Sequence, residues 1–477
     1  MLEFLNSIVT SCNDILWSYV LIFLLIGIGA YFTIHLKFPQ FRFFSHTFKL
    51  LRNGRKTSEG GDGAGISSFQ AFCISVASHV GTGNLAGVAI AVTVGGPGAV
   101  FWMWVIALLG AASSFVENTL AQVYKVKSEN GYRGGPAYYM EKALGNRKLG
   151  IVFSVLITIS FGLVFNSVQA NTVTLAFGGA FGITKFWGGM ILVSLTALVI
   201  FGGVKRIAKV AEVLVPVMAV AYVIVALFVI LKNINQVPNV FKMIFQGAFG
   251  FKQFTGGGVG AAIMMGIKRG LFSNEAGMGS APNAAATADV SHPVKQGIVQ
   301  VFGVFLDTIV ICSATAFIVL VSGEHLNEGL TGIELTQAAL TSQVGNWGNI
   351  FIAVCIFMFA WSSIIGNYYY GESNIEFMNG NKTCLTIFRF SVIGMVFWGS
   401  MSSIDIVWNM ADLFMGAMAL INLVVIAKVS KVLPKIIKDY AIQTKQGKDP
   451  IFHADSIDGL ENTECWNDEV KSGRKVV

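Results

Sequence analysis

Two clusters of small and polar residues interrupt apolar stretches that could otherwise form continuous helices. The first is Gly81-Thr82-Gly83-Asn84, and the second is Phe272-Ser273-Asn274-Glu275-Ala276-Gly277-Met278-Gly279-Ser280. Unwound backbone is tolerated inside a membrane only where it lines a cavity. Its freed N–H groups suit a carboxylate, and its freed carbonyls suit an ammonium group or a metal cation. A zwitterionic ligand such as an amino acid needs both, whereas close helix packing would also explain either cluster taken alone.

Further polar residues lie within apolar stretches. Asn166 and Gln169 are three residues apart and share one face of a helix, and Asn171 follows them. Hydrogen bonds between helices explain such amides as well as ligand contacts do. Ser362 and Ser363 are paired hydroxyls in mid-stretch, and such hydroxyls often bond back to carbonyls of their own helix.

Ionisable residues inside a membrane are costly and are therefore functional by default. Glu275 lies in the second cluster and is the acid that we expect to act there. Glu117 and Asp307 fit gating or packing equally well. The other charges on apolar stretches are Lys268 and Arg269, which suit a gate ion pair with an unassigned acid, and Asp405 and Asp412, for which we expect a structural role.

The amino-acid composition indicates a membrane environment. Of 477 residues, 54% are hydrophobic and 12% are charged, against about a quarter charged in soluble domains. The net charge of +7 is spread over short loops and forms no nucleic-acid-binding patch. Six cysteines show no disulfide or metal-ligand spacing. The segment GGDGAG at 60–65 lacks the Lys and Ser/Thr of a phosphate loop, so we expect a flexible loop there.

About 20 mostly apolar residues are needed to cross a bilayer, and the sequence predicts eleven such spans in an all-α polytopic membrane protein. No Lys or Arg precedes Lys37, so the first span is a retained helix and no signal peptide. Ten spans remain after it, as five plus five, and the two clusters fall in the first span of each five. This matched position favours a binding role over packing. The predicted spans lie near 15–36, 66–94, 99–124, 149–177, 187–204, 209–231, 257–288, 296–322, 347–371, 385–400 and 404–428.

Basic residues predict the orientation. Of the 33 Lys and Arg residues, 26 fall in loops on one side and 4 on the other, which places the N-terminus outside and the C-terminus in the cytoplasm. Four tryptophans near predicted span ends suit the membrane interfaces: Trp17, Trp187, Trp347 and Trp398. We divide the chain into an N-terminal helix with a basic, Phe-rich amphipathic segment (1–58), two five-helix repeats (66–231 and 257–429), and a cytoplasmic tail (430–477) with a short basic helix followed by disorder.

Several motifs together resemble the alanine/glycine:cation symporter family. They are Gly95-Gly96-Pro97-Gly98-Ala99-Val100-Phe101-Trp102-Met103-Trp104 with Gly110, the first cluster, Val168-Gln169-Ala170-Asn171, and the second cluster. The resemblance covers nearly all eleven spans. It implies a LeuT-type inverted-repeat core in which the first and sixth core helices are broken, preceded by one extra helix.

The resemblance also implies a function: a secondary symporter of the cell (inner) membrane that imports alanine or glycine with sodium, sometimes a proton, by alternating access. We expect no enzyme activity, no cofactor besides the coupling ion, and no obligate protein partner. The expected substrate-binding residues are Gly81, Thr82, Gly83, Asn84, Gln169, Phe272, Ser273, Asn274, Glu275, Ala276, Gly277 and Trp361. The expected sodium ligands are Ala77, Val80, Ser362 and Ser363.

At His79 the chain departs from many relatives, in which Arg stands just before the first glycine cluster. A neutral His that hydrogen-bonds between helices is one explanation. The other is that protonation of His79 repels sodium, so that uptake falls between about pH 7 and 5, because an unperturbed imidazole titrates near 6.5.

The same composition is shared by two other classes of membrane protein, channels and membrane enzymes. A channel would need a continuous polar pore, and a membrane enzyme would need a metal-spaced His/Cys/Asp cluster or a nucleophile with its base. The sequence favours neither.

Overall fold

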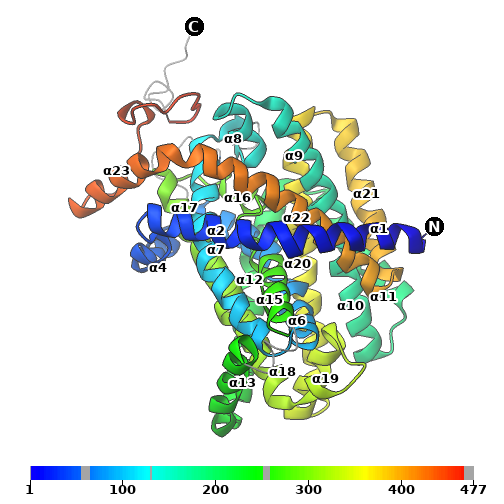
Figure 1. Ribbon diagram of the computed structural model, residues 1–477. Helices are drawn as coiled ribbons and strands as arrows, with labels where there is room; N and C mark the ends of the chain where they lie inside the picture. The colour runs from blue at the N-terminus through cyan, green and yellow to red at the C-terminus, as the bar shows by residue number, and fades with distance from the viewer. Residues whose placement is uncertain (1, 55–64, 129–130, 251–257, 467–477) are drawn as a thin grey trace.

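The computed structural model describes residues 2–54, 65–128, 131–250 and 258–466 as an almost entirely helical body (Figure 1). Its long helices are α1–η1–α2 (Leu2–Ile15, Leu16–Leu21, Ile22–His35), α7 (Gly98–Val123), α9–η3–α10 (Arg147–Ile159, Ser160–Phe165, Asn166–Phe181), α12 (Gly203–Lys232), α17–η5–α18 (Pro293–Val304, Phe305–Cys312, Ser313–Ser322), α20 (Trp347–Met378), α21 (Lys382–Met401) and α22 (Ile404–Val429). The shorter elements are α3 (Pro39–Arg42), α4 (Phe44–Asn53), α5 (Ser68–His79), η2 (Gly83–Gly87), α6 (Val88–Gly95), β1 (Val126–Ser128), β2 (Gly131–Arg133), α8 (Pro136–Lys142), α11 (Lys185–Ile200), η4 (Ile234–Gln236), α13 (Val237–Phe249), α15 (Gly258–Asn274), α16 (Ala281–Ala285), η6 (Glu324–Leu326), α19 (Gly332–Val344), η7 (Ser430–Val432), α23 (Leu433–Lys445) and η8 (Ala454–Ser456).

The described part of the chain contains eight helices that are long and apolar enough to cross a membrane, or up to nine if one bent pair counts as a span. The segment Arg206–Lys232, for example, reaches a mean hydropathy of 3.0. A multi-pass membrane protein is therefore confirmed. The predicted number of eleven spans is not reached by this measure, because α11 has only 16 residues and α15 only 17.

The bent pair contains the first glycine cluster. α5 begins with a capping box formed by Ser67 and Gln70 and ends at His79; the helix resumes at Gly83, bent by 46°. Val80 is extended, with φ −79° and ψ 92°. The interruption therefore covers residues 80–82, and Gly83 and Asn84 already belong to the next helical turn.

The second cluster interrupts the chain between α15 and α16. Helix α15 continues through Phe272, Ser273 and Asn274, three residues further than the cluster suggested. The non-helical residues are 275–280, where Glu275 has φ 54° and Gly277 and Gly279 each have φ 85°. A glycine adopts such angles without steric cost, whereas Glu275 is held there by its surroundings.

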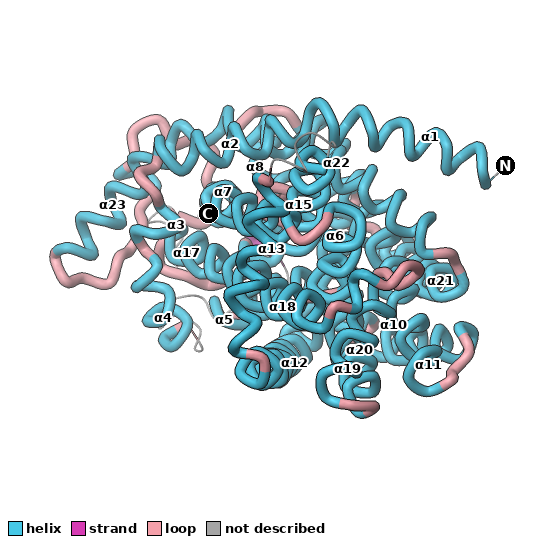
Figure 2. Tube along the Cα trace, turned by 60° about the horizontal axis from the view of Figure 1, so that its bottom comes forward, coloured by secondary structure: helices cyan, strands magenta, loops and turns pink. Residues whose placement is uncertain are grey.

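The two interrupted segments lie at the centre of the helix bundle. α7 packs along α15 and α17, and α20 packs against α5, α10 and α12. The tube in Figure 2 shows α15 and α6 side by side, with α1, α2 and α22 across the top. The residues at the interruptions are almost fully buried.

Among the described residues, α8, α13 and α19 occupy segments for which no helix was predicted. α19 lies against the first bent pair, where Thr336 donates to the Leu85 carbonyl at 3.0 Å. Gln337 donates to the Ala176 carbonyl of α10 at 3.1 Å. These short helices lack the length of a span, so a search for spans does not find them.

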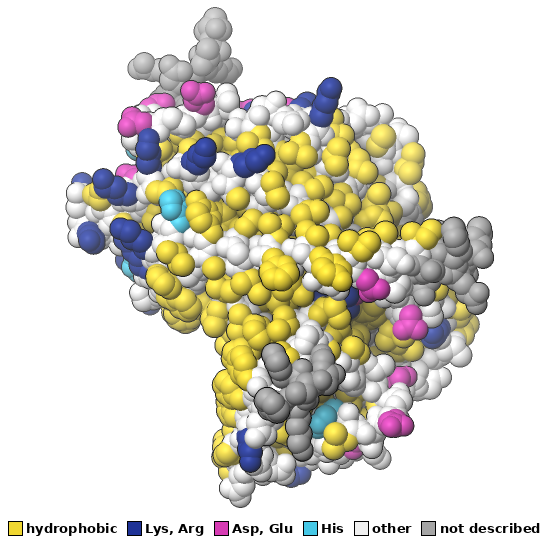
Figure 3. All heavy atoms as spheres, viewed as in Figure 1, with side chains coloured by type: hydrophobic (Ala, Val, Ile, Leu, Met, Phe, Trp, Pro, Cys, Tyr) yellow, Lys and Arg dark blue, Asp and Glu magenta, His cyan; other side chains and the backbone are white. Residues whose placement is uncertain are grey.

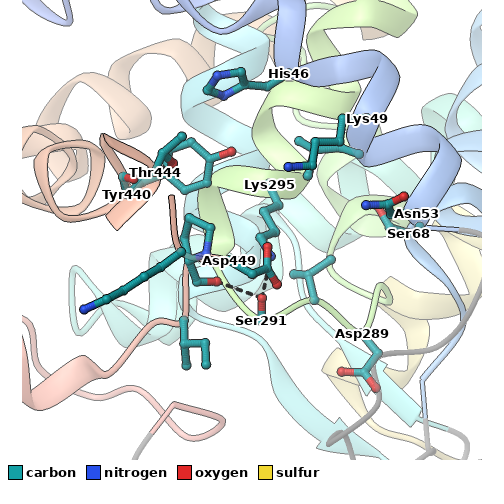
Figure 4. Close-up of a pocket in the computed structure, with 16 residues that line it drawn as sticks. His46, Lys49, Asn53, Ser68, Asp289, Ser291, Lys295, Tyr440, Thr444 and Asp449 are labelled. Atoms are coloured by element: carbon teal, nitrogen blue, oxygen red, sulfur yellow. Dashed lines mark hydrogen bonds and ion pairs between the residues drawn. The ribbon is translucent and has the colours of Figure 1, made fainter. Parts of the chain in front are cut away.

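The disorder expected after the basic helix α23 is wrong for residues 446–466. They form a strap in which Phe452 and Trp466 are buried. The Trp466 indole donates to the Gln122 carbonyl at 2.8 Å. Figure 4 shows Lys295 beside Ser291 and Asp449, with Nζ 2.6 Å from the Asp449 carboxylate. The polar composition suggested a solvated tail, but the buried side chains of Phe452 and Trp466 hold this segment against the helices.

Trp17 also differs from expectation. It is fully buried, and its indole donates to the Asp412 carbonyl at 3.2 Å. The span begins earlier than predicted, so Trp17 lies within it. Trp187, Trp347 and Trp398 are exposed on the surface, as interface residues should be. In the basic segment 37–58, α4 presents Phe44 and Phe48 outward. Residues 55–58 and most of GGDGAG (60–64) lie outside the described residues.

Candidate functional site

Four oxygen atoms converge where α5 ends beside α20. Ser363 Oγ lies 2.9 Å from the Ala77 carbonyl and 3.4 Å from the Val80 carbonyl, and Ser362 Oγ lies 3.5 Å from the Ala77 carbonyl. In a continuous helix the amide of Gly81 would bond to the Ala77 carbonyl, but it bonds instead to Asn84 Oδ1 at 2.9 Å. The interruption thus frees the Ala77 carbonyl.

Both hydroxyls also reach back to the Phe359 carbonyl of their own helix, at 2.8 and 2.9 Å. The back-bonding explanation and the ligand explanation are therefore compatible, because the same atoms serve both. The Phe359 carbonyl was not predicted from the sequence, although its position four residues before Ser363 is the one to which a helical hydroxyl bonds back. Neutral oxygen donors of this kind suit a hard monovalent cation.

The first interruption is tied to α10 and α20. Gln169 Oε1 accepts a hydrogen bond from the Thr82 amide at 3.1 Å. A Cβ atom on Gly81 would lie 2.9 Å from that same Oε1 and even closer to Ser363 Oγ, so a side chain at Gly81 would force Gln169 and Ser363 to move. The Thr82 hydroxyl is buried and has no hydrogen-bond partner among the described residues.

Asp307 connects the two interruptions. Its Oδ1 accepts from Asn84 Nδ2 at 2.6 Å, and its Oδ2 accepts from Ser273 Oγ at 2.8 Å. Asn274 is close by, with Nδ2 3.1 Å from Thr308 Oγ1. Asp307 therefore links η2 to α15. This link is compatible with both roles considered for Asp307, gating and packing.

Glu275 forms a second connection. Its carboxylate lies 2.8 Å from Ser78 Oγ on α5 and 2.5 Å from Ser280 Oγ. His79 Nε2 is 3.6 Å from Glu275 Oε2. Ser78 Oγ is also 2.7 Å from Asn367 Oδ1 on α20, and Asn367 in turn donates to Asn166 at 3.2 Å. The pH hypothesis for His79 stays a prediction, now with an acid beside the ring.

Glu117 holds the second interruption open. It accepts from the amides of Gly277 and Gly279, each at 3.0 Å, and from Asn422 Nδ2 at 2.7 Å. Gly277 had been expected to bind the substrate, but its amide is already bonded to Glu117. The amide of Ala276 bonds to Asn274 Oδ1 at 3.1 Å. The carbonyls of Phe272 and Ser273 therefore lose the helical donors they would otherwise accept from.

The start of η2 meets the end of α15. A Cβ atom on Gly83 would lie 3.0 Å from Ser273 Cα and 3.1 Å from Phe272 Cδ1. The start of one helix thus lies against the end of another, and the partial positive charge of one helix dipole adjoins the partial negative charge of the other. This is the juxtaposition that a zwitterion requires.

Aromatic and charged side chains lie next to the contact between η2 and α15. The Phe272 ring stacks on Phe165 with centroids 4.8 Å apart and contacts Trp408 at 4.6 Å. Arg269, whose partner the sequence left open, bonds to Asp412 at 2.5 Å and lies over the Trp408 ring. Lys268 Nζ is 3.3 Å from the same Asp412 oxygen.

Trp361 does not join the other expected residues. Its ring stacks on Phe357 in a separate apolar cluster with Ala170 and Val173 of α10. Successive residues of an α-helix are rotated by 100°, so Trp361 points nearly opposite to Ser363. Asn171 also serves packing, because its amide donates to carbonyls at the end of α21.

No group of three or more His, Cys, Asp or Glu side chains suited to a metal ion occurs in the described residues.

Comparison with known proteins identifies the family of the chain. The model of the sodium:alanine symporter family matches residues 2–454.

Three relatives are informative. The amino-acid carrier protein AlsT of Bacillus subtilis is 56% identical over 98% of this chain and 99% of its own length. GlnT of the same organism, described as a probable sodium/glutamine symporter, is 55% identical over 98% and 97%. The sodium/alanine symporter AgcS of Methanococcus maripaludis is 40% identical over 88% and 93%. Among solved structures, a manganese transporter of Eremococcus coleocola matches with a TM-score of 0.50 and 16% identity, covering 80% of this chain and 81% of its own, which is a likeness of fold alone.

Proposed function

The chain belongs to the sodium:alanine symporter family, and we propose that it imports a small neutral amino acid, alanine or glycine, together with sodium by alternating access. It is a transporter and not an enzyme. The observation that carries the proposal is the meeting of the η2 start and the α15 end, with the four-oxygen cluster next to it.

The proposed substrate site uses the helix ends. The amides of Gly83 and Asn84 at the start of η2 bind the carboxylate, because the N-terminus of a helix carries partial positive charge. The carbonyls of Phe272 and Ser273, which have lost their helical donors, accept from the ammonium group. Gly81 and Gly83 have neighbours at close contact distance, which supports a preference for a side chain no larger than methyl.

The proposed sodium site consists of the Ala77 and Val80 carbonyls and the Ser362 and Ser363 hydroxyls. The Phe359 carbonyl, shared by both hydroxyls, is added to this set. The ligands come from α5 and α20, so binding of sodium would hold these two helices together. An ion that ties two elements together can couple its own gradient to their relative movement.

For topology we propose eleven crossings, with α5 to α6 and α15 to α16 as broken first and sixth helices of two five-helix repeats (66–231 and 257–429). The 46° bend supports this for the first pair, since it fits a broken span or a re-entrant loop. Figure 3 shows Lys and Arg side chains gathered at the upper left, over α23 and its neighbours, with acidic side chains both among them and at the right. This distribution supports a cell-membrane protein with its C-terminus in the cytoplasm.

The test is uptake by the purified chain in vesicles. We expect labelled alanine and glycine to accumulate only with an inward sodium gradient, serine weakly, and leucine and phenylalanine not at all. Glutamine should be tested in the same assay, because the relative GlnT is described as a probable sodium/glutamine symporter. Strong glutamine or leucine uptake would contradict the size limit proposed from Gly81 and Gly83, and uptake indifferent to sodium but driven by a pH gradient would contradict sodium coupling.

A further inference from the structure

A basic cavity of about 430 Å³ lies where the turn after α2 meets α23. Of the residues that line it in the described part of the chain, none is acidic and five are basic: His35, Lys37, Arg42, Lys438 and Lys445. It is separate from the candidate transport site, and nothing in the proposed function uses it. Figure 3 shows the basic side chains gathered over α23 on this side of the molecule.

These cations are uncompensated within the part of the chain that the structure describes. The side chains of Lys37, Arg42, Lys438 and Lys445 are exposed, and no ion pair involves any of them. Like charges brought together repel one another. A cavity with a cationic lining and no counter-charge favours an anion.

The neighbouring cavity in Figure 4 shows the contrast. It too contains basic residues, but Lys295 there is paired with Asp449 at 2.6 Å, and Asp289 also lines it. That cavity supplies its own negative charge. The cavity beside Lys37 and Lys438 does not.

The shape of the basic cavity is fixed before any ligand arrives. Lys37 and Phe38 both have left-handed backbone angles, φ 59° and 55°, which cost energy in residues other than glycine. The turn is nonetheless anchored, because buried Gln40 donates to Thr33 Oγ1 at 3.0 Å. On the other wall, Phe43 contacts Tyr440 of α23 edge to face at 5.6 Å.

Apolar side chains border the basic cluster on the outer surface. Ile34, Phe38, Phe41 and Ile442 are 70%, 51%, 51% and 45% exposed. Large apolar residues next to a cationic pocket at the end of membrane helices suit a ligand with a charged head and a hydrocarbon body. A free phosphate would need only the cations.

We propose that this cavity binds the phosphate headgroup of an anionic phospholipid, with its acyl chains along Ile34, Phe38 and Phe41. The bound lipid would join α2 to α23, two elements far apart in the sequence. The phosphate chemistry is shared with soluble phosphate, so the experiment includes both.

The test compares two quadruple variants of the full chain in non-ionic detergent. One removes the cavity charges: Lys37→Gln, Arg42→Gln, Lys438→Gln and Lys445→Gln. The matched control removes four exposed cations outside the cavity: Lys148→Gln, Arg206→Gln, Lys209→Gln and Lys382→Gln. Retained lipid is counted by native mass spectrometry, and the unfolding midpoint is measured with dioleoyl phosphatidylglycerol, dioleoyl phosphatidylcholine or inorganic phosphate.

We expect the unmodified chain and the control variant to retain phosphatidylglycerol over phosphatidylcholine and to gain thermal stability from it. The cavity variant should lose this preference by about ten-fold or more, since several cations contribute. Equal loss in both variants would overturn the proposal in favour of diffuse surface attraction, and an unchanged cavity variant would overturn it outright. If inorganic phosphate stabilises the chain as well as the lipid does, the assignment to a lipid is wrong.

Discussion

At the scale of single residues, the proposed sodium site depends on two hydroxyls that replace water around an ion. Ser362 and Ser363 reach both their own helix and the carbonyls at the end of α5. Removing them leaves the carbonyls but opens the ligand shell on one side. Removal of the two hydroxyls should therefore weaken the binding of sodium more than the binding of the substrate.

We predict that Ser362→Ala with Ser363→Ala raises the sodium concentration for half-maximal uptake by about ten-fold, because a loss of about 1.4 kcal/mol in ion binding lowers the affinity by that factor. Substrate affinity at saturating sodium should change less. Ser194→Ala is the control, since that exposed hydroxyl only bonds back to the Met190 carbonyl. An unchanged sodium dependence in the double variant would remove these serines from the site.

A second residue-scale prediction concerns Gly81. Its added Cβ would lie 2.9 Å from Gln169 Oε1 and would clash with Ser363. We predict that Gly81→Ala lowers the apparent affinity for alanine and for sodium by about ten-fold or more, as expected for 1–3 kcal/mol of strain. Gly394→Ala on α21, where nothing lies within 4 Å, should transport normally. Normal uptake by Gly81→Ala would show that the junction has more room than its geometry indicates.

At the scale of elements, the second interruption is maintained by a side chain from another helix. Glu117 on α7 accepts from the freed amides of Gly277 and Gly279, and Asn422 on α22 completes its shell. An unwound segment in a membrane is stable only when its polar groups are satisfied. Glu117 is thus what allows residues 275–280 to remain non-helical.

We therefore predict that Glu117→Gln destabilises the protein by about 2–3 kcal/mol. Glutamine has an NH₂ group in place of one carboxylate oxygen, so one of the two backbone amides loses its acceptor. The unfolding midpoint in detergent measures this. Glu334→Gln, at an exposed position of α19, should leave it unchanged. Should both variants unfold alike, the interruption does not depend on Glu117.

At the scale of the whole molecule, the strap 446–466 fastens the C-terminal part of the chain to α7 and to the start of α17. Trp466 is 2% exposed and lies with its ring 4.8 Å from Lys125 Nζ. The strap's anchoring partners Gln122, Lys125 and Lys295 are not among the residues proposed to bind sodium or substrate. Its contribution should therefore be to stability and not to binding.

We predict that Trp466→Ala lowers the free energy of unfolding by about 3–5 kcal/mol, the usual range for a buried tryptophan. The affinity for alanine should stay the same in folded protein. Trp187→Ala is the matched control, because Trp187 is 63% exposed. A loss of affinity in Trp466→Ala with normal stability would instead connect the strap to the transport cycle.

The sequence alone determined the properties that depend on local composition. Apolar length predicted a multi-pass membrane protein, and the family resemblance was confirmed over residues 2–454. The glycine clusters predicted where the helices are interrupted to within three residues. The pairing of Ser362 and Ser363 with carbonyls near Ala77 followed from the resemblance, and the structure brings these atoms together.

Only the tertiary structure decided which polar groups satisfy one another, because hydrogen bonds between distant segments leave no local pattern. Asp307 bridging Asn84 to Ser273, Asp412 paired with Arg269, and Glu117 on the Gly277 amide all join residues far apart in the chain. The spacing of Trp361 and Ser363 fixes only that their side chains point apart on α20. That the Trp361 face packs against α10 while the Ser363 face meets the end of α5 was decided by the packing of the helices. Composition determines that a chain is buried in a membrane, but packing determines which face of each helix meets the ligand.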